Sequence, residues 1–267
     1  MTYDEYKLLK IKVKRGVAFT TIDNPPINLI SISLVEELVK FTTEVEMDNN
    51  VRVIVFDSAD PEIFLAHYDV GDLAEYPDVV PPKSSELHPL NKICEAFRRM
   101  SKVTIAKIEG RCRGGGSEFV LALDMRFGAI DKAILAQPEV LVGIIPGGGG
   151  TQRLPRIIGR ARALEVILSG NDISAELAEK YGYINRAFPA SELTVFVNAL
   201  AYRIASMPSA TIALAKQAVL VAEQLPIIEG LLEETYLFGQ SCALPEAKER
   251  MNRYLQLNGQ SRESELR

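Results

Sequence analysis

The sequence predicts an α/β fold in which a mostly parallel sheet is covered by helices. Short runs rich in Val and Ile, at residues 51–56 and 103–108, have the length of buried strands. The segments between such runs repeat apolar residues at helical spacing. Of the 267 residues, 47% are hydrophobic and 24% are charged, which is typical of a globular chain with a substantial core. Strands that alternate with helices favour a parallel sheet with right-handed crossovers.

The chain begins with a predicted hairpin. Residues 7–14 alternate apolar and polar side chains, Arg15 and Gly16 supply a turn, and residues 17–22 resume a β-rich run. A helix is predicted at residues 33–47, because its apolar positions recur at helical spacing.

A strand and helix rhythm continues through the first two thirds of the chain. The predicted elements are a strand at 51–56, a helix at about 86–100, a strand at 103–108, a helix at about 116–123 and an apolar run at 125–130. Residues 75–88, rich in proline and charge, predict a mobile loop within this rhythm.

The composition changes after about Ser169, where helical patterns dominate. We therefore divide the chain into a core at residues 1–190 and a helical C-terminal region at residues 191–267. Several helical stripes of this region are apolar, as at Leu231 and Leu232, so they require cover from the core or from another subunit.

Charge and cysteine content exclude several classes of protein. The formal net charge of −5 provides no global basic field for nucleic acid or anionic lipid. Cys94, Cys112 and Cys242 are widely spaced and form no Cys-x-x-Cys pair, which argues against a disulfide framework and a zinc ribbon. The two histidines have no ligand pattern beside them, so we expect no metal site.

Cellular location is predicted from the same features. No apolar run reaches the roughly 18 residues that span a bilayer, and residues 1–10 are charged without a signal-peptide core. With cysteine usage typical of a reducing compartment, these features predict a cytoplasmic protein without a membrane partner.

A glycine-rich turn at residues 110–119 is the first candidate for chemistry. Gly114, Gly115 and Gly116 precede a predicted helix, where unpaired N–H groups can hold an anion or an oxyanion. Close packing of the backbone is the alternative reading. A P-loop and a dinucleotide fingerprint are disfavoured, because the Lys-Ser/Thr pair and the glycine spacing are missing. Glu118 follows among apolar neighbours, so it is either a partly buried acid or a first-turn residue favoured by the helix dipole.

Two further segments are candidates. Glu139 ends an apolar stretch and precedes residues 143–151, whose glycines let the chain pass close to a ligand; the alternative is a surface charge before a tight loop. Thr151 is predicted to cap the helix that follows. The segment 64–70 suits a strand end over an active site, although a lone histidine such as His67 is usually structural.

These segments, in this order, resemble the signature of the enoyl-CoA hydratase/isomerase (crotonase) superfamily. The similarity covers roughly residues 5–257. It lies in residues 23–28 (Asp-Asn-Pro-Pro-Ile-Asn), 114–118 (Gly-Gly-Gly-Ser-Glu), 137–139 (Gln-Pro-Glu), 143–155 (Gly-Ile-Ile-Pro-Gly-Gly-Gly-Gly-Thr-Gln-Arg-Leu-Pro) and 182–186 (Gly-Tyr-Ile-Asn-Arg).

The resemblance implies a crotonase-like spiral of ββα turns and a helical C-terminal trimerisation region. It also implies a homotrimer or a dimer of trimers, an acyl-CoA substrate and no cofactor apart from the coenzyme A of the substrate thioester. The implied activity is that of an enoyl-CoA hydratase, a lyase that adds water to a 2-enoyl thioester. An isomerase or C–C bond hydrolase of the same superfamily that uses His67, and a noncatalytic binding protein that retains the fold, are the alternatives.

The resemblance also implies roles for individual residues. Glu118 and Glu139 match the two catalytic glutamates, and the backbone N–H groups of Tyr68 and Gly115 match the oxyanion hole. Two carboxylates that hold one water can deliver hydroxide to C3 and a proton to C2. The expected substrate-binding residues are Ala66, His67, Asp69, Gly114, Pro146 and Gly147.

One segment departs from the family pattern. Where the family has Ala-Gly-Ala-Asp, this chain has Ala-His-Tyr-Asp at residues 66–69. The backbone donor at Tyr68 is retained, but the two rings are expected either to narrow the thioester channel or to add a catalytic group.

Overall fold

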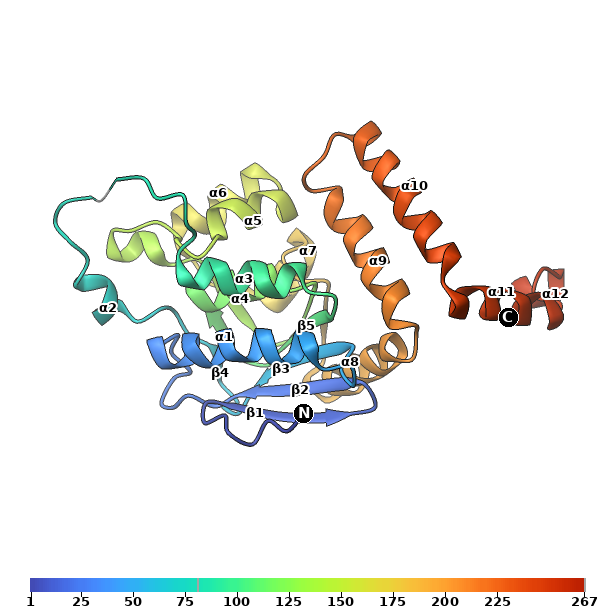
Figure 1. Cartoon of the computed structure of the whole chain (residues 1–267). Helices are drawn as coiled ribbons and strands as arrows, with labels where there is room; N and C mark the ends of the chain where they lie inside the picture. The colour runs from blue at the N-terminus through green and yellow to red at the C-terminus, as the bar shows by residue number, and fades with distance from the viewer. Residues whose placement is uncertain (81, 267) are drawn as a thin grey trace. The chain divides into compact units, whose positions relative to one another are not determined.

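The computed structural model describes residues 1–80 and 82–266, and two sheets lie within residues 9–188 (Figure 1). The larger sheet has six strands in the order β1-β2-β3-β5-β7-β10, and the smaller has the order β4-β6-β8-β9. In the described chain, β1 with β2 and β8 with β9 pair antiparallel, and the other pairs are parallel. The predicted α/β class with a mostly parallel sheet is therefore confirmed.

The strands are short and the helices connect them. The strands are β1 (Leu9–Lys14), β2 (Val17–Ile22), β3 (Val53–Ser58), β4 (Ile63–Leu65), β5 (Val103–Ile108), β6 (Arg111–Arg113), β7 (Met125–Ala129), β8 (Ile134–Ala136), β9 (Ile173–Ser174) and β10 (Arg186–Phe188). The helices of the same part are α1 (Ile32–Met47), α2 (Val70–Ala74), α3 (Pro89–Arg99), α4 (Gly115–Ala122), the 3-10 helix η1 (Glu139–Val142), α5 (Gly150–Ile158), α6 (Arg160–Ser169), α7 (Ala175–Tyr181) and α8 (Ala190–Ala205).

The chain winds through the two sheets in repeated ββα turns. In each turn the first strand joins the six-stranded sheet, the second joins the four-stranded sheet, and a helix follows. The turns are β3, β4 and α3, then β5, β6 and α4, then β7, β8 and α5. This is the spiral of ββα turns that the family resemblance implies.

Aromatic side chains hold two of these helices against the larger sheet. The ring of Phe56 in β3 lies 5.2 Å from that of Phe97 in α3 and 5.3 Å from that of Phe119 in α4, centroid to centroid. All three rings are fully buried and meet edge to face, the arrangement that aromatic quadrupoles favour. Since Phe119 follows Glu118, this packing also fixes the start of α4.

Some predicted boundaries differ from the structure. Strand β3 begins at Val53 rather than at residue 51, because the N–H groups of Arg52 and Val53 both donate to the Gly16 carbonyl at the start of the ladder. The predicted cap at Thr151 is wrong, since α5 already begins at Gly150 and its cap is Gly149, with φ +113°. Residues 75–80 and 82–88 form no helix or strand, as expected of a loop.

The chain divides into two compact units, Met1–Ala205 and a second unit that begins at Ser206. Helix α8 begins at residue 190, where the core was predicted to end. It nevertheless belongs to the first unit, because it packs against β2, β3, β5 and β7. The second unit consists of α9 (Ser209–Val221), α10 (Ile227–Ala243), α11 (Pro245–Gln256) and α12 (Arg262–Glu265), and α9 packs against α10.

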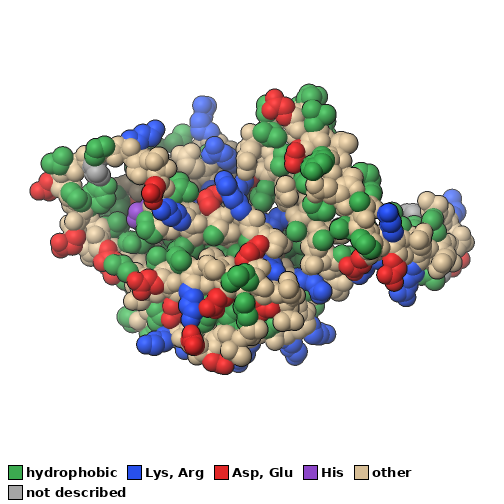
Figure 2. Space-filling model, in the orientation of Figure 1, with side chains coloured by type: hydrophobic (Ala, Val, Ile, Leu, Met, Phe, Trp, Pro, Cys, Tyr) green, Lys and Arg blue, Asp and Glu red, His purple; other side chains and the backbone are tan. Residues whose placement is uncertain are grey.

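Large apolar side chains are exposed on the second unit. Ile227, Ile228, Leu232 and Phe238 of α10 are each at least two thirds exposed. Figure 2 shows hydrophobic side chains exposed on these helices and elsewhere on the visible face, with acidic and basic side chains among them. In the described chain no single helix has the length and hydropathy to cross a membrane; α8 and α9 pass that test only when taken together across a bend.

Candidate active site

Three neighbouring strands end at the same edge of the four-stranded sheet. Strands β4, β6 and β8 are adjacent and parallel, so their carboxyl ends meet there. Residues 66–69 follow β4, residues 114–118 follow β6, and residues 137–139 follow β8. The three segments that the sequence singled out are thus brought together by strand order.

Two backbone N–H groups lie side by side at this edge. Ile30 forms a β-bridge with this segment: its N–H donates to the His67 carbonyl at 3.1 Å, and its carbonyl accepts the Asp69 N–H at 3.2 Å. The Tyr68 N–H therefore points away from Ile30. A Cβ built on Gly115 would lie 3.1 Å from the Tyr68 nitrogen. Gly115 is the first residue of α4, where N–H groups lack an intrahelical acceptor, and the described residues supply an acceptor to neither N–H. The two donors are therefore both available to one oxygen atom.

The flanking glycines allow this close approach. A Cβ on Gly116 would lie 2.1 Å from the Leu65 carbonyl oxygen, so no larger residue fits between α4 and the end of β4. Gly114 has φ +52°, and its Cβ would lie 3.0 Å from that of His67. The close-packing reading of the glycine turn is confirmed, and the oxyanion reading stays a prediction that the two adjacent N–H groups support.

Glu118 lies beneath the donors as a buried, hydrogen-bonded carboxyl group. Its side chain is 3% exposed, and its Oε1 accepts the Gly150 N–H at 2.8 Å. Burial raises the pKa of Glu118, while the N–H groups of Gly150, Gly148 and Gly149 and the charge of Arg153 oppose that rise. These four groups all favour the ionised form.

Glu139 is half-buried, and its carboxylate oxygens are buried without such support. It is the first residue of η1, and neither carboxylate oxygen has a hydrogen-bond partner among residues 1–80 and 82–266. Burial, the largest cause, raises the pKa of Glu139 to about 7; its own backbone N–H opposes the rise, and the nearby Glu118 charge adds to it. Both pKa values are raised overall, but Glu118 has several hydrogen bonds and a positive charge that favour its ionised form, and Glu139 lacks that support.

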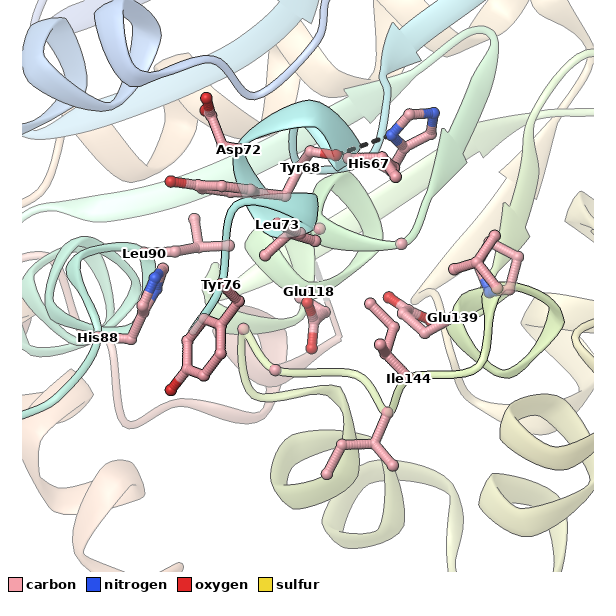
Figure 3. A pocket seen from close by; sticks show the side chains of 18 of the residues that line it. His67, Tyr68, Asp72, Leu73, Tyr76, His88, Leu90, Glu118, Glu139 and Ile144 are labelled. Carbon is pink, nitrogen blue, oxygen red and sulfur yellow. Dashed lines mark hydrogen bonds between the residues drawn. The ribbon is translucent and has the colours of Figure 1, made fainter. Parts of the chain in front are cut away.

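Both glutamates face a largely apolar cavity of about 450 Å³ (Figure 3). Its walls include the aliphatic side chains of Leu73, Leu90, Leu141, Val142, Ile144 and Ile145. The rings of Tyr68 and His88 meet edge to face at its rim, 5.8 Å apart. Such a cavity suits an apolar ligand whose reactive end reaches the carboxyl groups.

The predicted substrate-binding residues divide into two groups. His67, Gly114 and Gly147 line the cavity. Ala66, Asp69 and Pro146 are not among its described lining residues and instead shape the backbone around it. Asp69 caps α2 by accepting the Gly71 N–H at 2.8 Å, and Pro146 lies against Gly150.

The His67 ring is exposed and turned away from the two glutamates (Figure 3). Its Nδ1 lies 2.8 Å from the Tyr68 carbonyl oxygen, and because a carbonyl only accepts, Nδ1 carries a proton. This orientation gives no support to His67 as an acid or base for a ligand held between the glutamates.

Sequence reasoning missed the polar residues that hold the glycine loop at 147–150. Asn91 of α3 and Arg153 of α5 both donate to carbonyl oxygens of this loop. Arg153 lies in the glycine-rich family signature, which was the available signal, whereas Asn91 lies in an ordinary helical pattern. In the described residues, no three His, Cys, Asp or Glu side chains come together as a metal site requires.

The sequence matches the family model described as Enoyl-CoA hydratase/isomerase over residues 12–259. A probable mitochondrial enoyl-CoA hydratase of Dictyostelium discoideum is 33% identical over 248 residues, which cover 91% of this chain and 86% of the relative. The short-chain-enoyl-CoA hydratase of Clostridium acetobutylicum is 30% identical over 241 residues, covering 90% and 91%.

Solved structures agree with this match. The crystal structure of an enoyl-CoA hydratase from Bacillus anthracis is similar with a TM-score of 0.85 and 28% identity, over 94% of this chain and 96% of the other. That of a putative enoyl-CoA hydratase from Streptomyces avermitilis has a TM-score of 0.75 and 40% identity, over 98% and 97%. The sequence match covers nearly the whole chain, and the paired backbone donors and the two cavity-lining glutamates lie on the shared fold. The chain therefore belongs to the enoyl-CoA hydratase/isomerase family.

Proposed function

We propose that this protein is an enoyl-CoA hydratase, which adds water across the C2–C3 double bond of a 2-enoyl-CoA thioester. The observation that carries the proposal is the convergence of Glu118 and Glu139 on one cavity beside the N–H groups of Tyr68 and Gly115. The buried, unpartnered oxygens of Glu139 are suited to a water or substrate proton.

The two backbone donors hold the thioester carbonyl oxygen. As water attacks C3, negative charge develops on that oxygen, and donors already in place stabilise it without reorganising. Each such donor contributes about 3–4 kcal/mol to the transition state, judged by what the loss of one donor costs in other enzymes. The stabilised charge corresponds to an enolate, whose nucleophilic C2 accepts a proton in the same reaction.

The two glutamates divide the proton transfers. Ionised Glu118, favoured by three N–H groups and the Arg153 charge, accepts a proton from water while the water oxygen bonds to C3. Protonated Glu139 donates its proton to C2 as the enolate electrons form the C2–H bond. Afterwards Glu118 is protonated and Glu139 is ionised, so a proton must return to Glu139 through solvent before the next cycle.

The cavity walls indicate an apolar acyl group. The described lining residues include seven Val, Leu or Ile side chains and two tyrosines but neither lysine nor arginine. The acyl part of the thioester therefore occupies the cavity, and the coenzyme A phosphates lie outside it.

A direct assay distinguishes this activity from its alternatives. The purified protein is expected to hydrate 2-enoyl-CoA, followed by loss of the conjugated thioester absorbance and by mass spectrometry of the 3-hydroxyacyl product. Because the cavity wall is aliphatic, kcat/KM should rise from crotonyl-CoA to longer unbranched enoyl-CoA substrates. Turnover of a 3-enoyl-CoA or a β-diketone without any hydration would replace the proposal with an isomerase or a C–C bond hydrolase.

We also propose that the protein assembles as a trimer or a dimer of trimers. The support is the exposed apolar surface of α10, including Ile227, Leu232 and Phe238, which a free subunit would leave in water. Sedimentation velocity at micromolar concentration is expected to give the mass of three or six chains. Replacing Ile228 and Leu232 with Asp should lower that mass, while Leu164→Asp on α6 serves as an exposed control. A stable wild-type monomer would contradict the proposal.

A further inference from the structure

The carbonyl groups of the glycine loop at residues 147–150 are tied to two helices. The Asn91 side chain of α3 donates from Nδ2 to the Gly147 oxygen at 2.8 Å. The Arg153 side chain of α5 donates from Nη1 to the Gly148 oxygen at 2.9 Å. Two successive peptide groups of the loop are thus held from the side away from Glu118.

Because the peptide group is planar, a hydrogen bond that fixes a carbonyl oxygen also fixes the direction of the following N–H group. In a planar trans peptide the C=O of one residue and the N–H of the next point in opposite directions. The Gly147 oxygen, held by Asn91, therefore directs the Gly148 N–H, and the Gly148 oxygen, held by Arg153, directs the Gly149 N–H. Both of these N–H groups act on the Glu118 carboxylate, beside the Gly150 N–H that donates to it at 2.8 Å.

Arg153 is itself held in place. Its Nη2 donates to Glu95 Oε1 of α3 at 2.8 Å, and the Arg153 side chain is 14% exposed. A Cβ built on Gly149 would lie 1.8 Å from Nη1, and Gly149 has φ +113°, so this position admits only glycine beneath the guanidinium group. Glu95 also accepts a hydrogen bond from Arg99 Nε at 3.1 Å. Arg99 thus binds the same carboxylate as Arg153 but not the loop.

We propose that Asn91, Arg153 and Glu95 form a clamp of positioning residues that aims the glycine-loop N–H groups at Glu118 and so keeps this carboxyl group ionised for hydration. The clamp rests on the proposed function, since it deepens the role of Glu118 as the base. Asn91 and Arg153 bind the loop and Glu95 holds Arg153, so none of the three needs to contact the substrate. A planar arginine side chain suits the position, because it binds Gly148 and Glu95 at the same time.

The other charged and titratable groups around Glu118 do not replace this support. Those that interact with it from neighbouring elements are Cys94 of α3, Arg153 of α5 and Glu139 of η1. Strand β6 contributes Arg111 and Arg113, which pair with Asp172 instead. Burial keeps the Cys94 thiol neutral by raising its pKa to about 12, and Glu139 disfavours a second negative charge. Arg153 is the positive group among those that act on Glu118. It therefore supports the ionised carboxylate in two ways, by its charge and by holding the loop N–H groups in place.

The test compares Arg153→Gln and Asn91→Leu with a matched control, Arg99→Gln, which removes a guanidinium from the same Glu95. Glu118 is titrated directly by NMR of 13C-labelled glutamate, with its signal identified by its loss in Glu118→Gln. The Glu118 pKa is expected to rise by about one pH unit or more in Arg153→Gln and by less in Asn91→Leu, because the charged hydrogen-bond support is the larger loss. It should stay unchanged in Arg99→Gln.

Kinetics provide the second readout. The acid limb of the kcat/KM profile for hydration is expected to move to higher pH by the same amount as the Glu118 titration, and Arg153→Lys, which keeps the charge, should restore part of it. An unmoved Glu118 titration in folded Arg153→Gln and Asn91→Leu would overturn the clamp, even if both had lost activity. If the Glu118 titration moves in these variants while the wild-type protein shows no hydratase activity, the clamp is upheld and the proposed function is refuted. If Arg153→Gln does not fold, Asn91→Leu and Arg153→Lys decide the question.

Discussion

Glu118→Gln and Glu139→Gln are each expected to lower kcat for hydration by at least ~10²-fold, since each removes one of the two proton-transfer groups at nearly constant volume. Glutamine at residue 118 can still accept the Gly150 N–H through its amide oxygen, so the loop is expected to keep its shape. Glutamine at residue 139 removes the ability to carry a transferable proton. The loss should appear in kcat rather than in KM, because the substrate binds mainly through the apolar wall and the backbone donors.

The pH profile distinguishes the two variants. Because the pKa of Glu139 is raised to about 7, its proton-bearing form is lost as the pH rises through that value, and wild-type kcat/KM should fall above about pH 7. The residual activity of Glu139→Gln should lack this basic limb. Since the two carboxyl groups interact, each limb reports an apparent pKa of the pair.

Exposed Glu192 of α8 provides the control, as Glu192→Gln should leave both turnover and the pH limbs unchanged. Unfolding temperatures of all three variants establish that the fold is intact. Turnover of either active-site variant at the wild-type rate would contradict the two-glutamate mechanism.

Gly115→Ala is expected to lower kcat/KM for hydration by ~10²–10³-fold, the usual cost of losing one oxyanion donor. The new methyl group would lie 3.1 Å from both the Tyr68 nitrogen and Ile30 Cδ1, within the space between the two donors. A thioester oxygen must come within hydrogen-bond distance of both N–H groups, and a methyl group in that space prevents it. The neighbouring Gly116 is unsuitable for this test, because its Cβ would clash with the Leu65 carbonyl at 2.1 Å and disturb folding.

A glycine in open space provides the control for this substitution. A Cβ on Gly239 of α10 meets nothing within 4 Å, so Gly239→Ala should leave kcat/KM unchanged and slightly stabilise its helix. Thermal unfolding of Gly115→Ala should remain close to that of the wild type, since only side-chain and amide atoms crowd the new methyl group. Full activity in a folded Gly115→Ala protein would place the thioester oxygen elsewhere.

Much of this molecule could be read from its residues. Local apolar periodicity, which depends only on neighbours in the chain, predicts the hairpin, helix α1 and the six-residue strands β3 and β5. The glycine turn with Glu118 and the Gln-Pro-Glu segment with Glu139 are candidates because a charged residue within an apolar, glycine-rich stretch is costly to bury and indicates a function. Family membership followed from the order and identity of these motifs.

The three-residue strands β4, β6 and β8 were not predictable, because so few residues carry no periodic signal and their pairing joins distant parts of the chain. Yet their parallel order brings the three segments to one edge. The same limit applies to the His67 ring, whose direction depends on a hydrogen bond to Tyr68, and to Asn91, which contacts a loop 56 residues away.

By itself, then, the sequence determined the fold class and the family and identified two candidate glutamates, because these depend on residue identity and on local pattern. Only the tertiary structure decided which glutamate is supported as an anion. Burial raises the pKa of both, but Glu118 receives the N–H groups of a loop held by α3 and α5, while Glu139 has no such partner among the described residues. A pKa is set by the charges and dipoles that surround a group in space, and these come from elements far apart in the chain.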